Sequence, residues 1–192
     1  RGTRGGGLTD LPGRAAGLHR RCLHRGAHRH ARRAGSMPSP QPTTPTRPGS
    51  PADAALYDAI ATEHGTIYGY GLVSAHTTPD VNDLVSQAMA EHRLNREAAI
   101  NALAGRSVPA ALPAAGYQLP IDASNPGDAA KLALQMEEDT AVAWRAVAEQ
   151  ATTAEDRTLA VKALTDCAVL AARWRAVVGV TPVVAPFPGG ND

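Results

Sequence analysis

The sequence predicts an all-α fold, an antiparallel four-helix bundle in which one long crossover joins two helical hairpins. Beyond Pro51 the alanine-rich blocks repeat their apolar residues with the period of a helix, and strand signals are weak. Segments rich in proline, glycine and threonine divide these blocks into four. Two of these segments are tight turns, which make adjoining helices antiparallel, and the middle one is a connection of about 20 residues that can cross the length of the bundle.

The first hairpin is predicted from signals at the ends of its helices. Its first helix runs over about 52–76, with Pro51 near the first turn and the sequence HTTPD ending it. Its second helix begins with Thr78 as the N-cap and Pro79 in the first helical position, and Gly105 ends it. The two helices are therefore expected to pack against each other.

The second hairpin follows the stretch GRSVPAALPAAGYQLPIDASNPG, which has no helical period. Its first helix is predicted over about 128–151. The sequence TTAED then turns the chain, with Thr153 as the N-cap of a last helix that continues until Gly179. The sequence VVGVTPVV is interpreted as the end of that helix and the start of a tail.

Charge and composition divide the chain into three regions. We expect a basic arm and a Pro/Thr-rich linker over 1–51, the bundle over 52–180 and a C-terminal tail over 181–192. Up to Ser36 the arm holds nine Arg and one acid, whereas the rest of the chain holds ten Lys and Arg against seventeen Asp and Glu. Because the arm is dense in Gly, Arg and His and has almost no apolar periodicity, it is predicted to be disordered.

Two interpretations of the arm are open. Met37 begins the sequence MPSPQPTTPTRPGSPADAALYDAI, which is typical of a natural protein start, so residues 1–36 are predicted to be upstream-translated or vector-derived. Alternatively, the arginine-rich block binds a polyanion such as nucleic acid through phosphate contacts. Deletion of 1–36 distinguishes them, because only polyanion binding predicts a loss of retention on nucleic acid at moderate salt.

Each predicted helix interrupts its apolar stripe once with an acid. In the first helix Glu63 lies between Ile60 and Ile67 on the expected core face. In the third helix Glu138 and Asp139 are also candidates for the interrupting position, and the expected core face consists of Ala133, Glu137, Thr140, Trp144, Val147 and Ala151. The four interrupting acids are Glu63, Glu91, Glu137 and Asp166.

Hairpin geometry predicts that these acids meet near the middle of the bundle. Residues equally far from a turn face each other in antiparallel helices, and Glu63 and Glu91 are equally far from a turn centred near residue 77. The distances of Glu137 and Asp166 along the chain from the loop near residue 153 are equal to within one turn of helix. Both levels lie about 20 Å from their turns, so one acidic layer is expected.

Three interpretations of this layer are open, because burying several carboxylates together costs free energy unless cations, protons or hydrogen bonds compensate. The first is a site for iron or manganese. The second is a metal-free layer in which histidines and water bridge the carboxylates. In the third, the phase of the helices differs and the acids are exposed. The candidate metal ligands are Glu63, Glu91, Glu137, Glu138, Asp166, His64 and His92.

Six further residues bear on the bundle interior. Trp144 and Trp174 are predicted to pack in the core rather than to hold a substrate. Gly69 and Gly71 reduce helix stability, which indicates close approach of another helix or subunit. We expect Tyr68 and Tyr70 to pack with their hydroxyls at the edge.

The motifs EHGTIYGYGLVSAH and AEHRLNREAAINAL resemble the ferritin-like superfamily, and more narrowly an uncharacterised family of small, alanine-rich actinobacterial proteins (DUF4439-like). The resemblance covers about 52–180; it implies a ferritin-like bundle and assigns no activity. Ferritin-like di-metal centres carry Glu-x-x-His on two helices. Here no Glu-x-x-His occurs, so an intact di-iron oxidase is not expected; the residues three after the acids are Thr66, Leu94, Thr140 and Val169.

The predicted function is a non-catalytic binding or structural module with a degenerate carboxylate layer, forming a homodimer. The alternative is a di-metal protein that handles iron and oxygen. The chain has no Ser-His-Asp set, phosphate-binding glycine loop, cysteine cluster or dinucleotide fingerprint, so hydrolase, kinase and dehydrogenase functions have no support. No apolar run approaches the ~18 residues of a membrane span, and Cys22 and Cys167 form no disulfide framework, so a cytoplasmic protein is expected.

Overall fold

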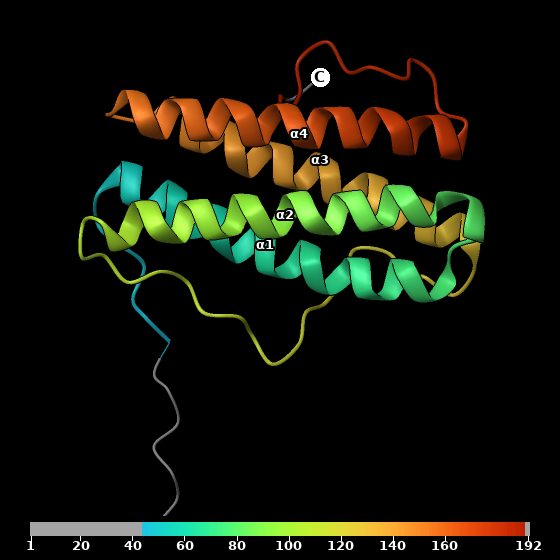
Figure 1. The fold of residues 1–192 in the computed structure, drawn as a ribbon, viewed down its shortest axis with the longest axis horizontal. Coiled ribbons are helices and arrows are strands. Elements are labelled where there is room, and N and C mark those ends of the chain that lie inside the picture. Colours follow the sequence, from blue (N-terminus) through green and yellow to red (C-terminus); the bar gives the residue numbers. More distant parts are fainter. Residues whose placement is uncertain (1–43, 191–192) are drawn as a thin grey trace, which may run out of the picture. The chain divides into compact units, whose positions relative to one another are not determined.

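A computed structural model describes residues 44–190, and this part of the chain is all-helical with no strand (Figure 1). The predicted all-α class is thus confirmed, and the helix ends lie within a few residues of those expected. The predicted basic arm lies outside the described residues. No helix among 44–190 is both long and apolar enough to cross a membrane. The elements are α1 (Pro51–His76), the 3-10 turn η1 (Pro79–Val81), α2 (Asn82–Ala104), α3 (Pro126–Gln150) and α4 (Ala154–Val178).

The four helices lie side by side, and each packs against two others (Figure 1). The α3–α4 pair makes the most extensive contact, followed by α1–α3 and α1–α2. The α2–α4 contact is much the smallest, and long polar side chains cross it where Arg173 donates to Gln87 and Lys162 pairs with Glu91. Helix α1 lies diagonally across the bundle from α4, and α2 lies diagonally across from α3. Because diagonal helices do not touch through their backbones, only side chains near the bundle axis can connect all four helices.

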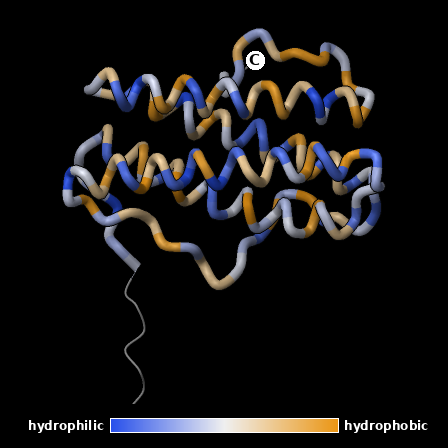
Figure 2. The backbone as a smooth tube through the Cα atoms, viewed as in Figure 1, coloured by the Kyte–Doolittle hydropathy of each residue, from blue (hydrophilic) through white to orange (hydrophobic). Residues whose placement is uncertain are grey.

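Two apolar clusters fill the interior. The first contains Ile60, Leu103 and Trp144, and the second contains Leu132 and Trp174 among others. Figure 2 shows apolar residues recurring along every helix, with hydrophilic residues between them. Buried polar residues, treated below, also lie on these helices: Glu63, Thr66, His92, Asn95, Glu137 and Thr140.

The expected core face is confirmed for α3 and almost entirely for α1. In α1, Ile67 is only half-buried and Thr66 is buried instead. A carboxylate on each helix, Glu63 and Glu137, is fully buried as predicted. The α3 residues expected to be buried, and found so, are Ala133, Glu137, Thr140, Trp144 and Val147, together with Ala151 just after the helix.

The expected core faces of α2 and α4 are wrong by one residue at the acidic layer. His92 and Cys167 are buried, whereas the side chains of Glu91 and Asp166 are 31% and 24% exposed. In an alanine-rich helix either neighbour can point inward with little change in apolar burial, so the cost of burying a carboxylate decides the phase. A thiol or a paired imidazole is easier to bury than a third or fourth carboxylate.

The caps of the two hairpins differ in how well they agree with the sequence. Thr153 caps α4 as expected, because its hydroxyl accepts a hydrogen bond from the amide of Asp156 at 3.1 Å. Thr78 makes no side-chain cap, and the chain forms the short 3-10 turn η1 before α2 begins. The expectation that Pro79 opens α2 directly is therefore wrong.

Gly69 lies where α1 meets α3 and the crossover. A Cβ atom at this position would stand 2.2 Å from Sδ of Met136 and 3.3 Å from Cδ2 of Leu119. At Gly71 a Cβ would meet nothing within 4 Å among the described residues. The predicted role of a close approach is thus confirmed for Gly69, and Gly71 has open space beside it.

The two glycines form a matched pair for a stability test. Gly69→Ala is expected to lower the free energy of unfolding by about 1 kcal/mol or more, because overpacking against the buried Met136 outweighs the gain in helix propensity. Gly71→Ala is expected to raise it by up to about 1 kcal/mol. Urea unfolding followed by circular dichroism measures both. Equal stabilisation of the two variants would show that Met136 moves aside without cost.

Candidate functional site

Three charged side chains from three helices meet in the interior. His92 of α2 lies between Glu63 of α1 and Glu137 of α3, and all three are at most 1% exposed. Its Nδ1 is 2.8 Å from Oε2 of Glu63, and its Nε2 is 3.0 Å from Oε1 of Glu137. Because both ring nitrogens face a carboxylate oxygen, the imidazole donates from both and carries a positive charge.

Aromatic donors extend this contact to the fourth helix. The indole of Trp144 donates to Oε1 of Glu63 at 2.7 Å, and the hydroxyl of Tyr70 donates to Oε1 of Glu137. The indole of Trp174 on α4 in turn donates to the Tyr70 hydroxyl at 2.8 Å. We call these six residues the polar network: Glu63, Tyr70, His92, Glu137, Trp144 and Trp174.

The contacts between α1 and α3 are reciprocal. Each helix carries a glutamate, a threonine three residues later and an aromatic donor seven residues after the glutamate. The donor of each helix bonds the glutamate of the other, Trp144 to Glu63 and Tyr70 to Glu137. Midway, the hydroxyls of Thr66 and Thr140 lie 2.9 Å apart. The same short sequence pattern therefore supplies the matching hydrogen bonds from both helices.

Electrostatics fix the protonation of the network. Burial alone lowers the pKa of His92, but the charge of Glu137 and the hydrogen bonds to Glu137 and Glu63 raise it to about 10. Burial, together with the charge of Glu137, raises the pKa of Tyr70 and that of the Cys167 thiol well above their usual values. Near neutral pH the imidazole is thus charged, while the phenol and the thiol keep their protons.

One oxygen of the network has no partner among the described residues. Oε2 of Glu137 is buried and makes no hydrogen bond, whereas Oε1 of the same carboxylate accepts from both His92 and Tyr70. Both oxygens of Glu63 are bonded. The two carboxylates of the network therefore differ, and Glu137 is the one with an oxygen that accepts no hydrogen bond.

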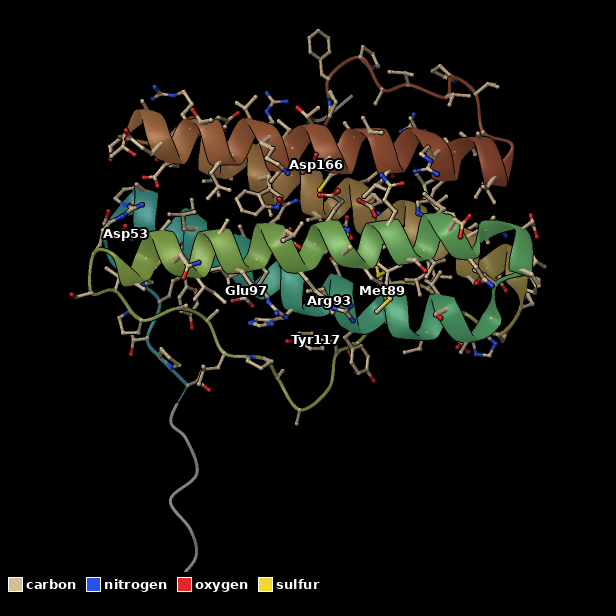
Figure 3. The ribbon with its side chains drawn as sticks, viewed as in Figure 1. Asp53, Met89, Arg93, Glu97, Tyr117 and Asp166 are labelled. Atoms are coloured by element: carbon tan, nitrogen blue, oxygen red, sulfur yellow. The ribbon has the colours of Figure 1, made fainter. Side chains whose placement is uncertain are left out.

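The other predicted site residues of α2 and α4 lie nearer the surface. Figure 3 shows Asp166 on the side of α4 that faces α2, where it accepts from Lys162 at 2.7 Å and from Asn95 at 3.3 Å. Glu91 is 3.8 Å from the same Lys162 ammonium. These two acids thus share a lysine at the loosely packed α2–α4 contact and do not join Glu63 and Glu137.

The remaining two candidates point elsewhere. Oε1 of Glu138 accepts two hydrogen bonds from Arg175 on the outer side of the α3–α4 pair, at 3.1 and 2.6 Å. His64 donates through Nε2 to the carbonyl of Ala111 in the crossover at 3.3 Å, and burial lowers its pKa. Of the seven residues proposed as ligands, Glu63, His92 and Glu137 are the ones that come together.

This arrangement does not fit a two-metal carboxylate centre. Among residues 44–190 no group of three or more His, Cys, Asp and Glu side chains is placed to hold a metal ion. In the network a charged imidazole stands between the carboxylates, and its two nitrogens have no lone pair to offer a cation. As placed, the negative charge of the two carboxylates is compensated by His92, and their oxygens also accept hydrogen bonds from Trp144 and Tyr70.

Tyr70, Trp144 and Trp174 are network residues that sequence reasoning treated as packing. The burial of Trp144 and Trp174 is as predicted. The expectation that the Tyr70 hydroxyl lies at the edge is wrong, because this side chain is fully buried and the polar atoms of all three residues bond inside the bundle. The usable signal is the spacing of seven residues from Glu63 to Tyr70 and from Glu137 to Trp144, two helical turns on the same face. A buried carboxylate needs hydrogen-bond donors, and here each aromatic donor reaches the glutamate of the other helix.

Comparisons with known proteins identify a family and a solved structure whose descriptions name no activity. The family model described as a domain of unknown function (DUF4439) matches residues 55–192. The crystal structure of a conserved hypothetical protein from Mycobacterium tuberculosis is 54% identical to this chain, with a TM-score of 0.67. That match covers 73% of this chain and 99% of the other. No curated protein matches the chain.

Proposed function

The chain belongs to the family described as a domain of unknown function (DUF4439), and we propose that it is a non-catalytic binding or structural module. In this proposal the polar network is metal-free and fixes the register of the four helices. The observation that carries the proposal is the position of His92, with each ring nitrogen on a carboxylate oxygen at 2.8 and 3.0 Å. The imidazolium supplies the positive charge that a metal supplies in a carboxylate-bridged centre.

We propose a ferritin-like, antiparallel arrangement of the helices, with the domain spanning 52–180. Its support is the reciprocal bonding of α1 and α3: Trp144 reaches Glu63, while Tyr70 reaches Glu137. Two helices can pair early residues with late ones in this way only if they run in opposite directions. The short turns within the pairs α1–α2 and α3–α4 and the long segment between α2 and α3 support the same topology.

A homodimer is part of the proposal. Its support is the exposed apolar surface of α4, where Val161, Val169 and Val177 are 51%, 52% and 46% exposed. Sedimentation velocity at several protein concentrations tests it, and a monomer at every concentration would contradict it.

The second candidate is a carboxylate-bound iron or manganese, and the unpaired Oε2 of Glu137 is the observation that favours it. This oxygen offers one anionic ligand without any change in the network. Further ligands would require His92 to lose its proton or the surface acids to turn inward. The cost of those changes makes this the weaker candidate.

Elemental analysis tests the two candidates. Protein purified without chelator is expected to hold far less than one equivalent of iron, manganese or zinc, and anaerobic addition of Fe(II) is expected to leave its Tm unchanged. The physical reason is that the carboxylates are already bonded to His92, Trp144 and Tyr70.

The matching variants are Glu63→Ala in the network and Asp166→Ala at the surface. One to two equivalents of metal in the wild type, lost in both folded variants, would overturn the metal-free proposal. Loss in Glu63→Ala with retention in Asp166→Ala would place the metal on the buried residues alone and would equally contradict it. Circular dichroism confirms that each variant is folded.

A further inference from the structure

A cavity of about 260 Å³ lies between the outer surface of the α3–α4 pair and the C-terminal segment. After α4 the chain turns at Gly179 and runs back along the bundle, so that residues 183–190 cover the cavity (Figure 1). Alanines leave the space open beneath this segment. The alanines that line the cavity on the helices are Ala141, Ala168, Ala171 and Ala172.

The covering segment is held at both ends. Near its start, Nη1 of Arg175 donates to the carbonyl of Pro182 at 3.3 Å. Near its end, Gly189 has a φ of 69°, and a Cβ there would stand 2.5 Å from the carbonyl oxygen of Ala141. Only glycine fits this close approach to the α3 backbone. The segment thus lies against the helices near both of its ends.

Hydrogen-bond acceptors and negative charge predominate at the polar edge of the cavity. Glu138, Asp139 and Arg175 line it, which gives two carboxylates against one guanidinium. Arg175 bonds only Oε1 of Glu138, and Gln135 bonds only Oδ1 of Asp139 at 2.9 Å. Among residues 44–190 the second oxygen of each carboxylate makes no hydrogen bond, so each residue that lines the cavity keeps an oxygen that can accept a further donor. Such a pair suits a ligand that carries several donors and a positive charge.

An aromatic ring and apolar side chains surround this edge. Phe187 lines the cavity yet is 71% exposed, and Val184 and Val142 are 68% and 51% exposed. An aromatic ring and carboxylates that line the same cavity suit an organic ammonium group, since the face of a ring attracts cations electrostatically. Apolar groups around the ring suit a short hydrocarbon body, which would cover surface that is now exposed.

We propose that this cavity binds a small organic cation, an alkylammonium with a short apolar body. Its ammonium group lies at the free oxygens of Glu138 and Asp139, and its body lies on the alanines under Val184 and Phe187. The volume fits a ligand smaller than the drug-sized molecules that occupy larger pockets. This proposal does not rest on the polar network, because the cavity lies on the outer side of α3 and α4.

Hexylammonium is the probe, with 1-hexanol and hexanoate as neutral and anionic equivalents of the same length. Isothermal titration and amide chemical-shift changes at pH 7 are expected to give hexylammonium roughly tenfold tighter binding than hexanol, and no binding of hexanoate. Equal binding of hexylammonium and hexanol would overturn the proposal, as would no binding of hexylammonium up to ~10 mM.

Four variants locate the site. Asp139→Asn and Glu138→Gln are each expected to weaken hexylammonium binding roughly five- to tenfold and to leave hexanol binding unchanged. Phe187→Leu is expected to weaken hexylammonium two- to fivefold, about what an exposed cation–π contact contributes. Ala172→Leu fills the cavity and is expected to abolish binding of both probes.

The matched control is Glu97→Gln on α2, a side chain that is 55% exposed and takes no part in lining the cavity. It removes the same charge as Glu138→Gln and is expected to leave binding unchanged. If it weakens hexylammonium as much as Glu138→Gln does, binding follows net charge and the proposed site is wrong. Unchanged binding in Ala172→Leu would overturn the proposal in the same way. Asp139 does not contact Arg175, so Asp139→Asn tests the charge without releasing the C-terminal segment.

Discussion

His92→Leu is expected to lower the free energy of unfolding by about 3–5 kcal/mol, the usual loss when one partner of a buried ion pair is removed. The substitution leaves Glu63 and Glu137 buried without the cation between them. Indole and phenol donors still reach one oxygen of each carboxylate, but they neutralise no charge. For a domain of this size such a loss is a large part of its stability, so urea or thermal unfolding must show it clearly.

The control is His76→Leu, which replaces an exposed histidine at the end of α1. It is expected to change the free energy of unfolding by no more than about 1 kcal/mol, because an exposed side chain outside any buried network is removed. If His92→Leu costs as little as His76→Leu, the imidazole is not the cation of the network. A rescue distinguishes charge from packing: adding Glu137→Leu to His92→Leu removes one uncompensated carboxylate and is expected to recover part of the loss.

Stability is expected to fall between pH 7 and pH 9, because His92 keeps its proton in the folded chain and loses it in the unfolded chain. The pKa of His92 is about 10 in the folded protein against 6.5 for the free side chain. A raised folded pKa means that its contribution is complete below about pH 6.5 and is lost as the pH rises toward 10. One extra proton bound by the folded state corresponds to about 1.4 kcal/mol for each pH unit in this window.

Other buried groups act in the same direction at higher pH. The pKa values of Cys167 and Tyr70 are raised by burial, so their contributions begin to be lost as the pH rises through the ordinary titration ranges of a thiol and a phenol. Below pH 6.5 the lowered pKa of His64 works the other way, because protonation then favours the unfolded chain. Stability should therefore be greatest near pH 6 to 7.

Urea midpoints at half-unit pH intervals measure this profile. Cys167→Ala removes the thiol and should leave the decline between pH 7 and pH 9 intact. A flat profile in that window would contradict a charged His92. Nitrogen-15 shifts of the imidazole give an independent check, since a charged ring at pH 9 is expected and a neutral ring would contradict the proposed protonation.

The helices were predictable because their signals are local. Pro51, Thr153 and Gly179 stand at helix ends in the sequence and in the structure, and they act through the backbone of their own turn. The α3 stripe was also predictable, since Trp144 and Glu137 lie on one line with Ala133 and Val147. A large aromatic residue fixes the phase of a helix by the apolar area that it must bury.

The phase of α2 and α4 was not predictable in the same way. Next to Glu91 and Asp166 stand residues that can turn inward in their place, His92 and Cys167, so a rotation by one residue changes little apolar burial. Which residue turns inward depends on partners contributed by other helices. His92 is buried because Glu63 and Glu137 lie on either side of its ring and accept its hydrogen bonds. That information is non-local, and the spacing within one helix does not contain it.

Trp144 and Trp174 are the only tryptophans of the chain, and they stand at the two ends of the polar network. Ultraviolet emission excited at the indole band therefore originates entirely from these two positions, without any label. A change in the charge of His92 or in the bond to Glu63 alters the field at the Trp144 indole, while the Trp174 indole reports on Tyr70. Single Trp→Phe variants would separate the two signals and so give an optical record of each half of the bundle interior.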